Sequence, residues 1–345
     1  MPTTRVADRQ VARLIGAASL LLLLGASPST SPAVAGPAMV VAGYQVSGNR
    51  ILDSRGNPFI VKGVDAVYGR FAGGDPNGYG LHNYQNAPRD LDNLKAQGVN
   101  TIRVSVAYGD YAGGPIGQTE YLTELDQVVA WVTQRGMVAE ISQGESGFSP
   151  SVVNFVGTLA GRYQANPLVW IKPDNEPNCA VYTPRCGDWS YWQTTEQQFV
   201  QAIRAAGNTA PIVVNCIWWS WDCSQIASYP LGDGSIIYGA HRYGNSATVF
   251  DAAQTSSCDA LWGNLAASFP MIVDEVGLFN GAGNASPAAW GAGFLDYTSN
   301  WVQARQGSGV IGFNDSWSDS NSMTNLSDGS WNAWGQAFIA HYLSK

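Results

Sequence analysis

Two glutamates occupy equivalent places in the chain, each just after a short apolar run. Glu176 follows Val169–Ile171 in the segment VWIKPDNEP, and Glu275 follows Met271–Val273 in the segment MIVDEVG. Pro177 cannot donate to a strand ladder, so the first run is interpreted as a strand that ends near Glu176. Two carboxylates at the ends of two strands can act as acid, base or nucleophile on one substrate, so this pair predicts acid/base chemistry.

Each glutamate has an aspartate close by that competes for the same role. These are Asp174 and Asp274. Neighbouring side chains on a strand point to opposite sides, so Asp274 is expected to face the helices if Glu275 faces the active site.

The elements that must position these residues alternate along the chain. Residues 101–106 (TIRVSV) alternate as a strand does, and residues 121–134 carry apolar side chains at helical spacing. The same unit recurs, with strands expected at 59–63, 101–106, 137–141, 169–171, 212–214, 236–239, 271–273 and 310–313. Eight strands alternating with helices predict an α/β fold, a single-domain (β/α)8 TIM barrel. Residues 44–62 predict a short N-terminal β-hairpin that plugs the bottom of this barrel.

The first 35 residues have the features of an export signal. Arg5, Arg9 and Arg13 precede the apolar run Leu14–Ala26, and Ala33-Val34-Ala35 forms a small-x-small cleavage pattern. The apolar run is shorter than the roughly 20 residues that a membrane-spanning helix needs. We therefore expect 1–35 to be a signal peptide and 36–345 to be the catalytic domain of a secreted protein, extracellular or periplasmic, with no membrane association after cleavage.

Composition narrows the class of partner. The net charge is −8, only 13% of residues are charged, and the chain has 13 Trp and 15 Tyr. An acidic chain is a poor partner for nucleic acid or an anionic membrane. So many rings either fill the core or line a cleft that binds the flat faces of sugars.

Five cysteines lie at positions 179, 186, 216, 223 and 258. Local disulfides Cys179–Cys186 and Cys216–Cys223 are the simplest assignment in an oxidising compartment, which leaves Cys258 over, although five thiols permit other pairings. No CxxC or nearby histidine accompanies them, so no zinc site is expected. The second loop contains three tryptophans, which form either a sugar-stacking ridge or packing against the barrel: Trp218, Trp219 and Trp221.

With the strands numbered, the chain resembles glycoside hydrolase family 5, the cellulase family A, over roughly residues 44–342. The resemblance rests on an ordered set of motifs: ILDSRGNPFIVKGV, GVNTIRV, Asn175-Glu176-Pro177, His241-Arg242-Tyr243, Glu275 and Trp317. The chain departs from the family at Gln143, where family cellulases usually have a histidine, and at Pro173 and Asp174, where apolar residues are usual.

The resemblance implies that Glu176 is the general acid/base and Glu275 the nucleophile of a retaining mechanism. Arg103 would then favour the charged form of Glu275, while burial would keep Glu176 protonated. Tyr243 would hydrogen-bond to Glu275, and His241 would orient the site or a sugar hydroxyl.

Two further residues are implied to touch the sugar itself. Asn175 resembles the family's asparagine that holds the sugar 2-hydroxyl, and Trp317 resembles the platform under the sugar at the cleavage point.

The expected function is a retaining hydrolase that cleaves β-1,4-glucan or β-mannan internally, as a monomer without a metal or an organic cofactor. Three alternatives stay open: a non-catalytic glycan-binding barrel protein, a β-1,3-glucanase and a glycolipid hydrolase of the same family. Loop shape, which separates these substrates, cannot be read from the motifs.

Overall fold

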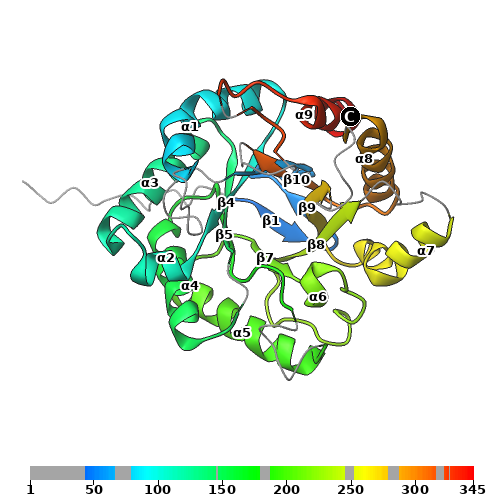
Figure 1. The fold of residues 1–345 in the computed structure, drawn as a ribbon. Helices are drawn as coiled ribbons and strands as arrows, with labels where there is room; N and C mark the ends of the chain where they lie inside the picture. Colours follow the sequence, from blue (N-terminus) through cyan, green and yellow to red (C-terminus); the bar gives the residue numbers. More distant parts are fainter. Residues whose placement is uncertain are drawn as a thin grey trace, which may run out of the picture. The chain divides into compact units, whose positions relative to one another are not determined.

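The computed structural model describes residues 43–66, 79–144, 147–178, 187–244, 252–278, 287–315, 322–325 and 327–345. Eight parallel strands close into a barrel in the order β10-β3-β4-β5-β6-β7-β8-β9, which confirms the predicted (β/α)8 fold (Figure 1). The strands are β3 (Val61–Ala66), β4 (Thr101–Val106), β5 (Val138–Gln143), β6 (Val169–Lys172), β7 (Ile212–Asn215), β8 (Ile236–Gly244), β9 (Met271–Leu278) and β10 (Gly309–Asp315).

Helices surround the strands (Figure 1). They are α1 (Tyr79–Ala96), α2 (Tyr108–Gly113), α3 (Gln118–Gln134), α4 (Pro150–Tyr163), α5 (Trp189–Ala205), α6 (Ile217–Ser220), α7 (Ala252–Leu261), α8 (Pro287–Ala304) and α9 (Ala333–Phe338), with a 3-10 turn at Gly263–Ala267 and a π turn at Ile339–Leu343. In the parts of the chain listed above, none of the helices combines the length and the apolar character needed to span a bilayer.

Several predicted boundaries differ from those observed, among them the ends of β8 and β9, which extend to Gly244 and Leu278. The first barrel strand begins at Val61 rather than Phe59, because the main-chain nitrogen of Phe59 donates to Ile51 in the hairpin instead of joining the barrel. The sequence pattern also predicts one continuous helix over residues 248–268, but in the described part α7 ends at Leu261, and after Trp262, whose φ of −159° is not helical, the chain continues as the 3-10 turn.

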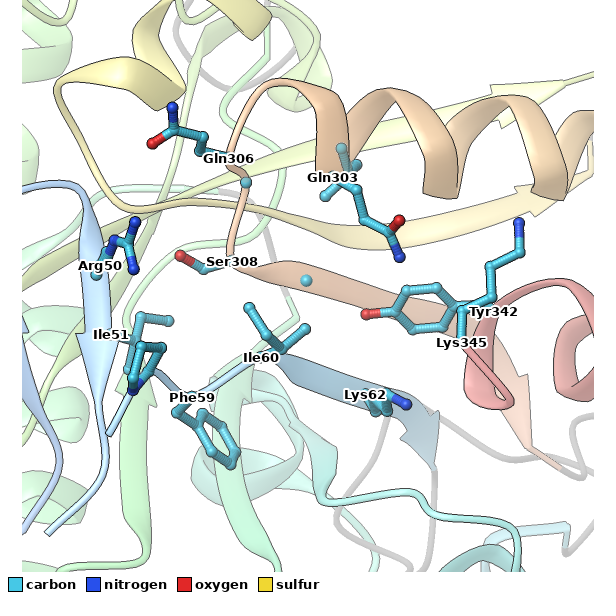
Figure 2. A pocket seen from close by; sticks show the side chains of 14 residues that line it. Arg50, Ile51, Phe59, Ile60, Lys62, Gln303, Gln306, Ser308, Tyr342 and Lys345 are labelled. Atoms are coloured by element: carbon cyan, nitrogen blue, oxygen red, sulfur yellow. The ribbon is translucent and has the colours of Figure 1, made fainter. Parts of the chain in front are cut away.

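The hairpin closes the lower end of the barrel, as expected. Its strands β1 (Gln45–Ser47) and β2 (Arg50–Leu52) pair antiparallel, and Ile51 is buried against Val61 and Trp170 inside the barrel. A pocket of about 410 Å³ opens at this same end, where Ile51, Phe59 and Tyr342 contribute to its lining (Figure 2).

Side chains that point into the barrel form an apolar layer below and a charged layer above. The apolar layer consists of Val61, Val138, Trp170, Val213, Ile237, Ile272 and Ile311. Because side chains on a strand repeat every two residues, the next inward positions on four of these strands are Glu140, Lys172, Asn215 and Asp274. All four are buried, so the floor of the upper barrel end is polar.

Candidate active site

Glu176 and five other predicted site residues come together at the upper end of the barrel. Arg103 lies on β4, His241 and Tyr243 on β8, and Glu275 on β9, while Asn175 follows the end of β6. Their hydrogen bonds connect them to one another across the barrel. The structure therefore brings together residues that lie up to 172 positions apart in the sequence.

A β-bulge in β9 gives that strand two consecutive inward carboxylates. Ala240 of β8 pairs with Val273, yet the next residue, His241, pairs with Glu275, so one residue of β9 is extra. The expectation that Asp274 faces the helices is therefore wrong. Asp274 points into the barrel, where its carboxylate accepts from Lys172 at 2.7 Å.

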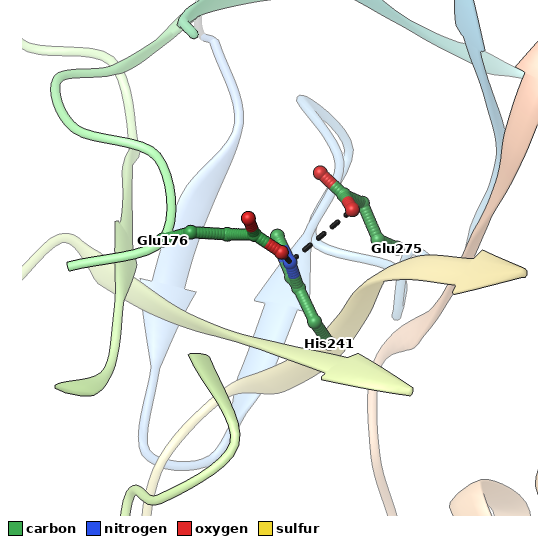
Figure 3. A group of neighbouring side chains, drawn as sticks. All are labelled: Glu176, His241 and Glu275. Atoms are coloured by element: carbon green, nitrogen blue, oxygen red, sulfur yellow. Dashed lines mark hydrogen bonds and ion pairs between the residues drawn. The ribbon is translucent and has the colours of Figure 1, made fainter. Parts of the chain in front are cut away.

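Glu176 and Glu275 converge on one histidine ring (Figure 3). His241 Nδ1 lies 2.7 Å from Glu176 Oε1 and 3.2 Å from Glu275 Oε2. One oxygen of each carboxylate and one nitrogen of His241 all lie within 4.8 Å of one another. Two carboxylates that approach one another this closely can act on the same bond of a bound sugar.

Glu275 is buried and surrounded by donors. Arg103 Nη1 lies 2.5 Å from its Oε1, and the Tyr243 hydroxyl donates to its Oε2 at 2.6 Å. Burial opposes ionisation, but the charges of His241, Arg103 and Lys172 outweigh it and lower the pKa of Glu275 to about 2. The carboxylate is therefore ionised at neutral pH, as a nucleophile must be.

Glu176 has a different environment. Its side chain is 28% exposed, so the burial expected for it is only partial. Its φ of 53° lies in the left-handed region, and its main-chain nitrogen donates to Asn215 Oδ1 at 3.2 Å. This contact fixes the turn that carries the carboxylate over the end of β6.

His241 is charged between the two glutamates. Burial disfavours its protonated form, but the carboxylates of Glu275 and Asp274 raise the pKa of His241 to about 9. A protonated Nδ1 donates toward both catalytic candidates, which holds their oxygens on one side of the ring.

The buried charges beneath the site were not predicted. Asp65 lies 3.2 Å from Arg103 Nη1, and Lys172 bonds to Asp274, with Glu140 enclosed beside them. Their signal in the sequence was a charged residue inside an otherwise apolar strand, as in VWIK and MVAEIS.

The Cys216–Cys223 disulfide is present and closes the loop that contains α6. Trp218 and Trp219 are each 42% exposed, and both have a φ of 55°. The main-chain nitrogen of Trp219 donates to the Pro177 carbonyl at 3.1 Å, so this loop is attached to the turn that follows Glu176.

The remaining sequence predictions lie outside the site or outside the described residues. Trp317 and the Cys179–Cys186 pair fall on residues that the structure does not describe. Asp174 accepts a hydrogen bond from the Gly147 main chain, and Cys258 is buried. Gln143 is buried at the end of β5.

Glu176, His241 and Glu275 are also the group, among the described residues, whose ligand atoms are close enough to hold a metal ion. Arg103, Tyr243 and protonated His241 direct donors at both oxygens of Glu275. Such donors stabilise a bare carboxylate, which suits nucleophilic chemistry better than metal ligation.

Comparison with known proteins gives a consistent result. The sequence profile described as cellulase (glycosyl hydrolase family 5) matches residues 52–321. A mannan endo-1,4-β-mannosidase from Streptomyces lividans is 23% identical over 320 residues, which cover 84% of this chain and 72% of the relative.

Solved structures that share the fold include a β-glucanase and an endoglucanase. A β-glucanase from Saccharophagus degradans, determined in complex with cellotetraose, has a TM-score of 0.72 and 24% identity over 86% of this chain and 92% of its own. The catalytic domain of the major endoglucanase from Xanthomonas campestris pv. campestris has a TM-score of 0.69 and 17% identity over 88% of this chain and 100% of its own.

Proposed function

Because the chain belongs to glycosyl hydrolase family 5, we propose that it is a secreted, retaining endo-glycosidase that cleaves β-1,4-linked glucan or mannan. Glu275 is the nucleophile and Glu176 is the general acid/base. The observation that carries this proposal is the approach of oxygens of the two carboxylates to within 4.8 Å on a shared histidine, with donors on both oxygens of the buried Glu275.

The reaction proceeds by double displacement. A Glu275 oxygen attacks the anomeric carbon while the glycosidic bond breaks, and Glu176 gives its proton to the leaving oxygen. Glu176 then takes a proton from water, whose oxygen attacks the same carbon and releases Glu275 with the original configuration restored.

The neighbouring residues act on the nucleophile or the sugar. Arg103 and Tyr243 hold the Glu275 carboxylate. His241 contacts both glutamates and fixes the position of their carboxylates relative to each other. Asn175 binds the 2-hydroxyl of the sugar that is cleaved, and Trp317 provides a stacking platform beneath it. A contact to the 2-hydroxyl strengthens as charge develops at the anomeric carbon, so it accelerates the reaction.

The substrate class is proposed from relatives that differ among themselves. One curated relative is a mannosidase acting on mannan, and one structural neighbour is a β-glucanase that binds cellotetraose.

We propose further that residues 36–345 form the mature enzyme, exported as a monomer and active without a cofactor. Sequencing the N-terminus of the protein from culture medium tests the cleavage site.

The function is tested by measuring reducing-sugar release from a cellulose derivative, β-mannan, mixed-linkage glucan and β-1,3-glucan. Glu176→Gln is expected to lower the rate by about 10²- to 10⁴-fold, and Glu275→Gln by at least as much. Glu120→Gln, on the exposed side of α3, is the matched control and should keep full activity.

Three outcomes would count against the proposal. Unchanged activity in either variant would remove that glutamate from the mechanism, and an inverted product anomer in the NMR spectrum would exclude double displacement. Binding of a glycan without any cleavage would favour the non-catalytic alternative.

A further inference from the structure

Lys172 is a fully buried lysine directly beneath the proposed catalytic residues. It is the last residue of β6 and none of its surface is exposed. Lysine is almost never fully buried unless it is paired. Its ammonium group lies 2.7 Å from Asp274 Oδ2 and 2.8 Å from Asn175 Oδ1.

The contact with Asn175 is shared with a second cation. Arg103 Nη2 also donates to Asn175 Oδ1, at 2.8 Å. Ammonium and guanidinium groups can only donate hydrogen bonds, so the amide atom that faces them must be the oxygen. The orientation of the amide is therefore fixed by chemistry, and its NH2 group points away from the two cations.

The carboxylate of Asp274 compensates the charge of Lys172 inside the barrel. It accepts from Lys172 and, at 2.8 Å, from Asn215 Nδ2. The β9 bulge brings Asp274 and Glu275 inward together, so the charge pair lies directly under the nucleophile.

We propose that Lys172 is a positioning residue for glycoside cleavage, holding the Asn175 amide with its NH2 group directed at the sugar 2-hydroxyl. The inference rests on the proposed function, in which Asn175 contacts that hydroxyl. Arg103 Nη2 makes the second contact to the amide, but the place of that guanidinium is set by the bonds of its Nη1 to Glu275 and Asp65, so Lys172 supplies the contact that does not depend on the nucleophile.

The test compares two substrates that differ by one oxygen. These are an aryl β-glycoside of the disaccharide that the enzyme releases, and the same compound lacking the 2-hydroxyl on the sugar that is cleaved. Lys172→Met in the full chain should lower kcat on the parent compound by about 10- to 100-fold, less than the roughly 10²- to 10³-fold loss for removing a transition-state donor itself. KM for the parent compound should change little. On the 2-deoxy compound, kcat of the variant should stay near the kcat of the wild-type enzyme on that same compound.

A merely structural lysine would give another pattern. Equal losses on both substrates would overturn the proposal. So would additive losses in Lys172→Met/Asn175→Ala, because the two changes should remove the same contact. Lys62→Met is the matched control: Lys62 lies on β3 and donates to the Leu343 carbonyl at 2.8 Å, and its loss should leave both rates unchanged.

Folding and the proposed function are checked separately. Lys172→Met leaves the Asp274 carboxylate without its cation, so Lys172→Met/Asp274→Asn, which removes both charges, is tested as a second variant against the same two substrates. If Glu275→Gln retains activity, the proposed function fails. If Glu275→Gln is inactive but both Lys172 variants match wild type on the parent compound, only this inference fails.

Discussion

At the scale of single residues, Glu275 and Glu176 share a histidine but differ in what else surrounds them. Glu275 is 4% exposed and receives donors on both oxygens, whereas the Glu176 side chain is 28% exposed at the open end of the barrel. Full enclosure by donors favours an ionised carboxylate, and an exposed position leaves room for a leaving group and then for water. The two proposed roles follow from this difference.

The Tyr243 hydroxyl offers a test of how the nucleophile stays ionised. Tyr243→Phe removes the donor at 2.6 Å from Glu275 Oε2 and so raises the pKa of Glu275 above its value of about 2. The acid limb of kcat/KM against pH should move upward by about one pH unit. Tyr163→Phe, which loses a comparable bond to Asp126 far from the site, should leave the limb in place. An unmoved limb in Tyr243→Phe would mean that the hydroxyl does not stabilise the carboxylate.

At the scale of elements, the bulge in β9 depends on a glycine in the adjacent strand. A Cβ on Gly239 would lie 2.5 Å from Asp274 Oδ1, which is far inside a normal contact. Gly239→Ala should therefore displace Asp274 and lower the free energy of unfolding by about 1–3 kcal/mol. Denaturant unfolding and kcat should both show the loss. In Gly117→Ala, where a new Cβ meets nothing within 4 Å, neither should change appreciably.

The loop after β7 holds an unusual backbone. Trp218, Trp219 and Ser220 have consecutive φ values of 55°, 55° and 61°, a conformation that costs roughly 1–2 kcal/mol per residue. The Cys216–Cys223 disulfide and the Ser220 hydroxyl, which donates to the Gly239 carbonyl, hold this conformation in place. This strained backbone exposes two indoles beside the turn that carries Glu176. A strained conformation that exposes aromatic rings favours a sugar-stacking role over packing.

If that role is correct, Trp218→Ala and Trp219→Ala should each raise KM on the polymer by roughly 2- to 10-fold, as expected for the loss of one aromatic contact. The kcat on a short aryl glycoside should stay unchanged. Ile60→Ala removes another exposed large side chain, at the opposite end of the barrel, and should not affect KM. If KM for the polymer is unchanged in both tryptophan variants, the loop packs against the barrel and does not bind sugar.

These elements also show how far the sequence alone could lead. Period-two and helical spacing predicted all eight strands and the hairpin, because burial imposes those periods directly. The bulge was not predicted, since an extra residue leaves no periodic trace, and strict alternation then placed Asp274 on the wrong side. Lys172 was placed beyond the expected strand 169–171, and Glu140 lay inside the expected strand 137–141 without a role, whereas both charges belong to the polar layer of the barrel.

At the scale of the whole molecule, the upper barrel layer couples stability to pH. Burial, with the charges of Asp274 and Asp65, raises the pKa of Glu140 to about 7, although Lys172 and Arg103 oppose it. Asp65 is raised in the same way to about 6, mainly by burial. A raised carboxyl pKa stabilises the fold below the unfolded value and loses that contribution as pH rises through the folded value.

The other titratable groups of this layer affect stability in other pH ranges. Because the pKa of Glu275 is lowered, its ionised carboxylate stabilises the fold above about pH 4.5, and this stabilisation is lost as the pH falls toward 2. Because the pKa of His241 is raised, its protonated ring stabilises the fold below about pH 6.5, and this stabilisation is lost as the pH rises through 9. Together with Glu140 and Asp65, these signs place maximum stability at mildly acidic pH, with a decline on either side.

Glu140→Gln separates one of these contributions from the rest. Neither Glu140 oxygen has a hydrogen-bond partner in the described part of the chain, and glutamine keeps the shape without titrating. Between about pH 4.5 and 7 the wild-type fold retains a proton that the unfolded chain releases, a penalty of at most about 3 kcal/mol at neutral pH. The variant's Tm should therefore exceed the wild type's above pH 7 and converge with it below pH 4.5, as followed by thermal unfolding across the range. Glu120→Gln, at an exposed position, should track the wild-type curve. If Glu140→Gln instead ran parallel to wild type at every pH, Glu140 would titrate normally in the fold, and the decline above pH 4.5 would have to come from Asp65 and His241.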